Sequence, residues 1–148
     1  MLVVGRLLLV KKMVKTNFEK LEVYQLAERL ADEVWKMVED WNNFQKITIG
    51  SQIVRSADSV GANIAEGVGR GTALDNKRFV RNARGSLYET MHWLRRCYNR
   101  SLITKKQVDV IKPIIEKLAP KLNSYLKSIG IIHESSTNNL QQATNSRK

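Results

Sequence analysis

The sequence predicts an all-α fold, an antiparallel up-down-up-down four-helix bundle. Four segments carry apolar residues in steps of three and four, which is the period of a helix with one buried face. The connections between these segments are short and contain capping residues or glycines, and short connections favour antiparallel neighbours. No segment requires the apolar–polar alternation of a strand. With 148 residues, 43% of them hydrophobic, the chain has material for one core, so we expect one domain.

The first two helices are separated by a pair of asparagines at positions 42–43. Thr16 or Asn17 can cap the first helix, because Glu19 follows Thr16 at the spacing of a capping box. The second helix is expected to start near Thr48. The predicted core positions are Val23, Leu26, Ala27, Leu30, Val34, Met37, Val38 and Trp41 in the first helix, and Ile49, Ile53, Ala57, Val60, Ile64 and Val68 in the second.

Two features distinguish the second helix. Its small residues predict that a neighbouring backbone approaches closely; they are Ser56, Ala57, Ser59, Gly61, Ala62 and Ala65. Asn63 is expected to bond across to a neighbouring helix, and Glu66 is expected to pair with Arg70 one turn later. The alternative for Asn63 and Glu66 is that they face a ligand.

The third and fourth helices both begin with capping signals. Thr72 with Asp75 opens the third helix, which runs to about Arg100, and Thr104 with Gln107 opens the fourth. Pro113 and Pro120 fall at outward positions of the fourth helix. We therefore predict that the helix continues through both prolines and bends at each of them. The predicted core positions are Val80, Ala83, Leu87, Met91, Leu94 and Tyr98, followed by Val108, Ile111, Ile115, Leu118, Leu122, Tyr125 and Ile129.

The ends of the chain are expected to lie outside the bundle, which spans residues 17–130. Residues 1–16 are expected to form a basic and apolar N-terminal extension, whose apolar run is too short and too interrupted at Gly5 and Arg6 to cross a bilayer. No basic residue precedes this run and no A-x-A-like cleavage site follows it, so it does not resemble a signal peptide. Translation starting at Met13 is one explanation for this extension. Residues 131–148 are mostly polar and without periodicity, which predicts a disordered tail.

The chain is basic, and the charge is unevenly distributed. Its 25 Lys and Arg residues against 14 Asp and Glu residues leave a formal charge of +11, which favours a polyanionic partner. Residues 70–100 hold eight basic residues against two acidic ones. On a helical wheel, basic residues of the third helix form a stripe around Tyr88, and further arginines widen this stripe on one side. The candidate nucleic-acid-binding residues are Lys77, Arg78, Arg81, Arg84, Tyr88, Arg95, Arg96 and Arg100.

Two interpretations of this stripe remain open. In the first, the arginines contact phosphates and Tyr88 stacks on an unpaired base. In the second, the basic residues pair with the first helix, where residues 18–41 hold seven acidic residues against three basic ones. The six lysines against two acidic residues in residues 101–130 favour nucleic-acid binding.

Catalysis, metal binding and cofactor binding have no support in the sequence. His92 and Cys97 point in different directions on a helix, and no Glu-x-x-His pair of a di-iron bundle is present. The single cysteine forms no internal disulfide, which fits a reducing cytoplasm. Trp93 forms a second face of the third helix with Phe79, Ser86 and Cys97, so this helix has two neighbours in its bundle or one neighbour and another subunit. We therefore expect a non-enzyme that forms a homo-oligomer.

Residues 52–71, QIVRSADSVGANIAEGVGRG, and 78–89, RFVRNARGSLYE, carry a family resemblance, together with FEKLEVYQLA at 18–27. They resemble the four-helix bundle family of proteins encoded in 23S ribosomal RNA intervening sequences. The resemblance implies an antiparallel bundle that assembles as a ring, commonly a pentamer, with no known catalysis. Residues 92–103, HWLRRCYNRSLI, also resemble the accessory variability determinant of diversity-generating retroelements, which implies a pentamer that binds nucleic acid with a reverse transcriptase.

The predicted function is therefore a cytoplasmic, oligomeric scaffold that binds RNA or DNA through the third and fourth helices. One alternative is an accessory subunit of a retroelement reverse transcriptase. The other is a purely structural interaction protein with a charge-paired surface. The neighbouring genes distinguish the first alternative, since a reverse transcriptase would adjoin it.

Overall fold

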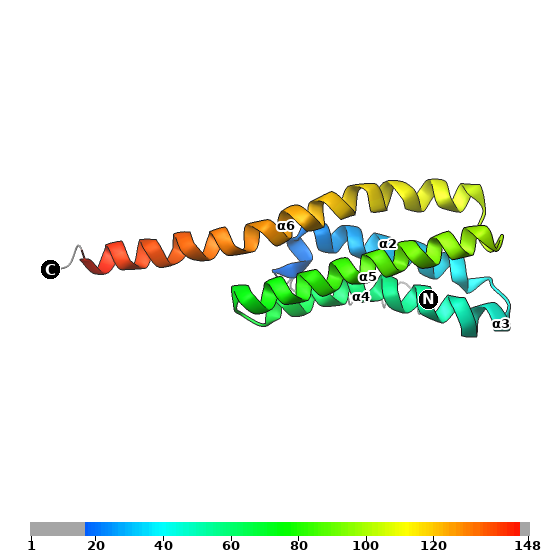
Figure 1. Ribbon diagram of the computed structural model, residues 1–148, viewed down its shortest axis with the longest axis horizontal. Helices are drawn as coiled ribbons and strands as arrows, with labels where there is room; N and C mark the ends of the chain where they lie inside the picture. The colour runs from blue at the N-terminus through cyan, green and yellow to red at the C-terminus, as the bar shows by residue number, and fades with distance from the viewer. Residues whose placement is uncertain (1–16, 146–148) are drawn as a thin grey trace, which may run out of the picture.

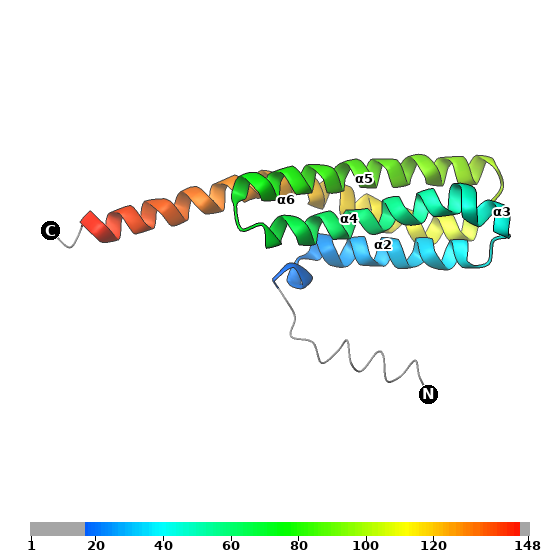
Figure 2. The same cartoon turned by 90° about the horizontal axis from the view of Figure 1, so that it is seen from below.

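The described part of the chain contains four long helices, which lie side by side in the bundle (Figures 1 and 2). This computed structural model describes the backbone of residues 17–145 and the side chains of residues 17–130. Within residues 17–145 there is no strand, which confirms the all-helical prediction. The long helices are α2 (Glu22–Glu39), α4 (Ser51–Gly69), α5 (Ala73–Asn99) and α6 (Lys105–Asn145). The expected N-terminal extension lies outside the described residues.

The start of the first helix differs from the prediction. Residues Phe18–Lys20 form a 3₁₀ turn, η1, and α2 begins only after Leu21, whose backbone is extended. Asn17 makes no side-chain capping bond, because it has helical backbone angles itself. Thr16 lies outside the described residues. Gln25 instead donates from Nε2 to the Glu19 carbonyl, 3.0 Å away, which ties the turn to α2.

The second helical segment begins earlier than Thr48. Asn42 caps it in a reciprocal capping box with Gln45: the Gln45 amide donates to Asn42 Oδ1 over 2.9 Å, and the Asn42 amide donates to Gln45 Oε1 over 3.2 Å. From there α3 (Asn43–Gln45) runs into a π-helical turn, η2 (Lys46–Gly50), and then into α4. The Thr48 hydroxyl donates to the Phe44 carbonyl, 2.6 Å away. This hydroxyl supports the irregular turn that precedes α4.

The caps of the last two helices are confirmed. The Asp75 amide donates to Thr72 Oγ1 over 3.2 Å. The Gln107 amide donates to Thr104 Oγ1 over 3.2 Å, and the Thr104 amide donates back to Gln107 Oε1 over 2.9 Å. Both capping pairs therefore position their helices as the sequence predicts.

Helix α6 passes through both of its prolines and beyond the predicted end of the bundle. Pro113 and Pro120 are exposed, so each ring lies on the face where a lost backbone hydrogen bond is open to water. The backbone stays helical to Asn145, where the sequence predicted a tail from residue 131 (Figure 1). No glycine or proline follows Gly130 in this stretch, and extending an existing helix needs no new nucleation.

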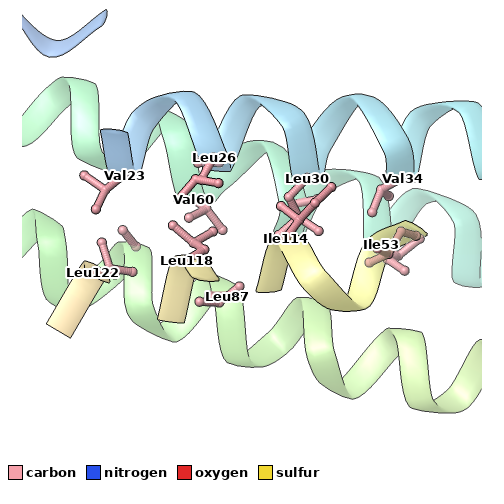
Figure 3. Close-up of a cluster of buried hydrophobic side chains, with 14 of the residues drawn as sticks. Val23, Leu26, Leu30, Val34, Ile53, Val60, Leu87, Ile114, Leu118 and Leu122 are labelled. Atoms are coloured by element: carbon pink, nitrogen blue, oxygen red, sulfur yellow. The ribbon is translucent and has the colours of Figure 1, made fainter. Parts of the chain in front are cut away.

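One apolar core joins the four helices (Figure 3). Helix α2 packs beside α4 and α6, and α5 packs beside the same two helices. Leu30, Ile53, Leu87 and Leu118 come from the four different helices and have almost no exposed surface. The predicted core positions of α2 and α4 are confirmed as buried or partly buried.

The core holds one buried polar contact between helices. Thr90 of α5 donates from Oγ1 to Ser56 Oγ of α4 over 3.1 Å, and the Ser56 hydroxyl also reaches the Ile53 carbonyl at 3.0 Å. The small residues of α4 let another helix approach: a Cβ added to Gly61 would lie 3.5 Å from the Tyr24 ring of α2. Asn63 differs from its prediction, since its Nδ2 donates to the Ser59 carbonyl of its own helix, 2.8 Å away.

The buried face of α5 turns along the helix, and this corrects two core positions. Met91 and Tyr98 are 42% and 57% exposed, whereas Thr90 and Cys97 are fully buried. In its C-terminal half α5 separates from α6, leaving an apolar groove of about 590 Å³ between the two helices, with Met91 and Tyr98 on its wall. Ile114, which the predicted seam of the fourth helix omitted, is buried.

Candidate nucleic-acid interface

The eight candidate residues all belong to α5 or its C-cap, and the structure divides them by what they contact. Lys77 and Arg84 reach α6. The Lys77 Nζ atom lies over Gly130, 2.7 Å from where a Cβ would stand, and Arg84 Nη1 donates to Asn123 Oδ1 over 3.2 Å. These two cations therefore lie at the seam between α5 and α6, and Arg84 forms a hydrogen bond across it.

Arg78 contacts residues of its own helix, α5. Its guanidinium lies 3.6 Å from the Asp75 carboxylate and 5.1 Å from the centroid of the Phe79 ring. Arg70, at the end of α4, covers the same ring at 5.1 Å and pairs with Glu66 over 2.7 Å, which confirms the predicted Glu66–Arg70 pair. The two guanidinium groups and the ring form a compact cluster at one end of α5.

The other four arginines lack acidic partners. Within the described residues, Arg81, Arg95, Arg96 and Arg100 form no ion pair with a carboxylate. Arg81, Arg95 and Arg100 are exposed, and Arg96 is half-buried. Tyr88 is 56% exposed and lies between Arg81 and Arg95 on the same face. This part of α5 therefore presents positive charge and an aromatic ring to solvent.

The acidic first helix does not neutralise α5, because α2 and α5 do not pack against each other. Helix α2 forms ion pairs with α6 instead: Glu22 accepts from Lys117 at 3.0 Å and from Lys121 at 2.8 Å. Hydrogen bonds from Lys121 and then Lys117 lower the pKa of the Glu22 carboxyl. Charge pairing between helices is therefore present in the chain, but it involves lysines of α6 rather than the arginines of α5.

A second acidic position lies between α2 and α4. Burial, and secondly the charge of Asp32, raise the pKa of the Asp58 carboxyl. A raised pKa means that the ionised carboxylate is disfavoured there. Asp32 and Asp58 therefore place two carboxyl groups near each other on the α2 and α4 side of the bundle.

Cys97 is a structural residue. Its side chain is fully buried, and burial raises the pKa of its thiol to about 11, outweighing the opposite effect of Arg100. The neighbouring arginines therefore do not create a reactive thiolate. His92 is exposed, so the two residues point apart as expected. In the described part of the chain, no three His, Cys, Asp or Glu side chains converge as a metal site would require.

The second face of α5 is used inside the chain. Phe79 and Cys97 are buried, and Ser86 and Trp93 are half-buried. Of the two options that the sequence left for this helix, contact with two neighbours of its own bundle therefore applies. The residues that the sequence did not single out are Asn123 and Gly130, which receive Arg84 and Lys77; only the helix pairing reveals them.

The fold and this surface define an all-helical protein with one basic helix face. Residues 19–124 match the family described as 23S rRNA-intervening sequence protein. The chain belongs to that family, as the sequence resemblance predicted. A solved structure from Bacteroides thetaiotaomicron, a protein of unknown function from the S23 ribosomal protein family, is 26% identical with a TM-score of 0.65. The similarity covers 71% of this chain and 95% of that one.

No curated protein matches the sequence. Across the portion that the structure describes, no helix combines the length and the apolar character needed to span a membrane.

Proposed function

We propose that this protein is a non-enzymatic, cytoplasmic, oligomeric scaffold that binds RNA or DNA through α5 and the adjoining surface of α6. The observation that carries the proposal is the group of arginines at positions 81, 95, 96 and 100, none of which meets a carboxylate within the described residues. Cations that are free of internal partners can neutralise phosphates and release their counterions. The family description makes 23S ribosomal RNA the first ligand to test.

The test is fluorescence anisotropy with the full chain and a labelled fragment of 23S ribosomal RNA. Phosphate-dominated binding should weaken steeply between about 50 and 200 mM salt. Arg81→Ala and Arg95→Ala should each weaken binding to all sequences and reduce the salt slope by about one. Arg29→Ala is the matched control, because it removes an exposed arginine from α2. A flat salt response, or an equal loss from the control, would contradict the proposal.

The same proposal includes assembly. The chain is proposed to have up-down-up-down helix order and to form a closed ring, the pentamer that the family resemblance implies. In support, the acidic α2 is not a neighbour of the basic α5, so α2 can contact a different surface of another copy and leave the arginines of α5 open. Heterologous contacts of this kind can close a ring. Trp35, Phe44 and Ile47, all strongly exposed near the α2–α4 connection, supply apolar contact area.

Light scattering after size-exclusion chromatography gives the molar mass of the assembly, and hence the number of chains in it. Five chains are expected, and a monomer at micromolar concentration would contradict the assembly. If Arg81→Ala and Arg95→Ala changed the mass while the parent protein bound no nucleic acid, the chain would instead be a charge-paired structural protein.

A further inference from the structure

A hollow of about 380 Å³ lies on the outer surface of α5, and nothing in the bundle fills it. It is lined by Tyr88, Met91, His92 and Arg95. These positions are spaced at three and four residues, so they share one face of the helix. Tyr88 is 56% and Met91 42% exposed, which leaves an aromatic ring and a thioether open to solvent beside an imidazole and a guanidinium. This combination offers flat and polarisable surfaces together with positive charge.

The two rings that line the hollow, those of His92 and Tyr88, differ in the contacts that fix their positions. The His92 ring stands edge-to-face against Trp93, with centroids 4.9 Å apart, and Trp93 Nε1 donates to Glu89 Oε1 over 3.3 Å. This arrangement holds the imidazole at one side. Tyr88, in contrast, makes no ring pair and no side-chain hydrogen bond within the described residues. Its ring face is therefore available for stacking.

The cations beside the hollow lie in line with it. Arg81 precedes Tyr88 by seven residues and Arg95 follows it by seven, so each lies about 10 Å from it along the helix. Arg84 is one turn before Tyr88 and is held by Asn123. A nucleic-acid strand that lies along this face would therefore contact Arg81, then the Tyr88 ring, then Arg95.

We propose that this hollow binds the base of an unpaired nucleotide, with phosphates of neighbouring nucleotides in the same strand on Arg81 and Arg95. The ligand class is then single-stranded or looped RNA or DNA. In a duplex the base faces are stacked on one another and cannot reach Tyr88, whereas an unpaired base can stack on an aromatic ring. This inference rests on the proposed nucleic-acid binding and adds to it the conformation of the ligand.

The experiment compares a labelled hairpin that has an unpaired loop with a blunt duplex of equal length, in anisotropy titrations of the full chain. Tyr88→Ala should weaken binding of the hairpin by about 5- to 150-fold, the range for loss of one base–aromatic stack. It should leave duplex binding unchanged, and Tyr88→Phe should bind like the parent. Tyr98→Ala is the matched control, because it removes an equally exposed tyrosine of α5 that lines the neighbouring groove.

Each other outcome contradicts this inference, and the outcomes separate it from the proposed function. If both ligands bind with the expected salt dependence and Tyr88→Ala changes neither affinity, the stacking site is wrong and the phosphate-binding face stands. If no nucleic acid binds, both proposals fail. If Tyr88→Ala leaves binding intact but lowers the molar mass of the assembly, the hollow is a contact between copies of the chain.

Discussion

Replacing Gly67 or Gly85 by alanine is expected to change the stability of the protein in opposite directions. The comparison tests how closely the helices pack. Both lie inside long helices, where glycine costs about 0.5–1 kcal/mol relative to alanine. At Gly85 no heavy atom lies within 4 Å of the position that a Cβ would occupy. Gly85→Ala is therefore expected to stabilise the protein by about 0.5–1 kcal/mol.

Gly67 faces α5 at close range. An added Cβ would lie 2.6 Å from Asn76 Oδ1, 3.1 Å from Phe79 Cβ and 3.3 Å from the Asn76 carbonyl oxygen. The Asn76 side chain is tied to Tyr125 through a 3.4 Å hydrogen bond, and its backbone belongs to α5. Overpacking of this kind costs about 1–3 kcal/mol, which exceeds the gain in helix propensity. Gly67→Ala is therefore expected to destabilise the protein by about 0.5–2 kcal/mol.

Urea unfolding followed by far-UV circular dichroism measures both effects. With a slope of about 1.5 kcal/mol per molar urea, Gly85→Ala should raise the midpoint by about 0.3–0.7 M and Gly67→Ala should lower it by about 0.3–1.3 M. Protein concentration is held constant, because assembly makes apparent stability concentration-dependent. If Gly67→Ala stabilised the protein as much as Gly85→Ala at an unchanged slope, the close contact between α4 and α5 would be refuted.

Three further predictions concern the core and the titratable groups. Leu118→Ala, at a position with no exposed surface, should cost about 2–5 kcal/mol in the same unfolding assay, and a loss below 1 kcal/mol would contradict its burial. Cys97, buried and with its thiol pKa raised to about 11, should resist iodoacetamide at pH 8 in the native protein and react once urea unfolds it, as measured by mass spectrometry. The pKa of Asp58 is raised in the folded state, so its destabilising effect is absent below the unfolded pKa and complete above the folded pKa. Asp58→Asn should therefore raise the melting temperature at pH 7 and bring no gain near pH 3; an equal gain at both pH values would contradict this origin.

The sequence predicted the helices well because local signals and tertiary packing agree in most of them. The Thr72–Asp75 and Thr104–Gln107 caps lie where expected, and the periodic apolar residues of α2 and α4 are buried. The start of the second helical segment was predicted too late, although the Asn-x-x-Gln spacing of its capping box was available in the sequence. Periodicity alone gave no sign of the π-helical turn.

The candidate surface was predicted less completely, because helix periodicity gives the direction of a side chain but not its neighbour. Tyr88, Arg81 and Arg95 share an exposed face as the wheel predicted. The wheel also assigned Met91 and Tyr98 to the core, but α6 separates from α5 at these positions and leaves them in a groove. The pairing of Arg84 with Asn123 joins residues 39 positions apart, and only the packed helices reveal it.

The π-helical turn η2 affects how this chain can tolerate a change in length. The Ser51 amide donates to the Lys46 carbonyl, five positions back, so the turn holds one residue more than an α-helix would. Lys46 precedes Ile53 by seven residues, and in an uninterrupted α-helix the two would share the face that packs into the core. The extra residue rotates Lys46 out to solvent, where it is exposed, while Ile53 stays fully buried. A one-residue deletion in this turn would therefore give a regular α-helix in which Lys46 precedes Ile53 by six residues and stays off the core face. Converting the turn to α-helix without a deletion would instead turn the Lys46 ammonium group toward the core.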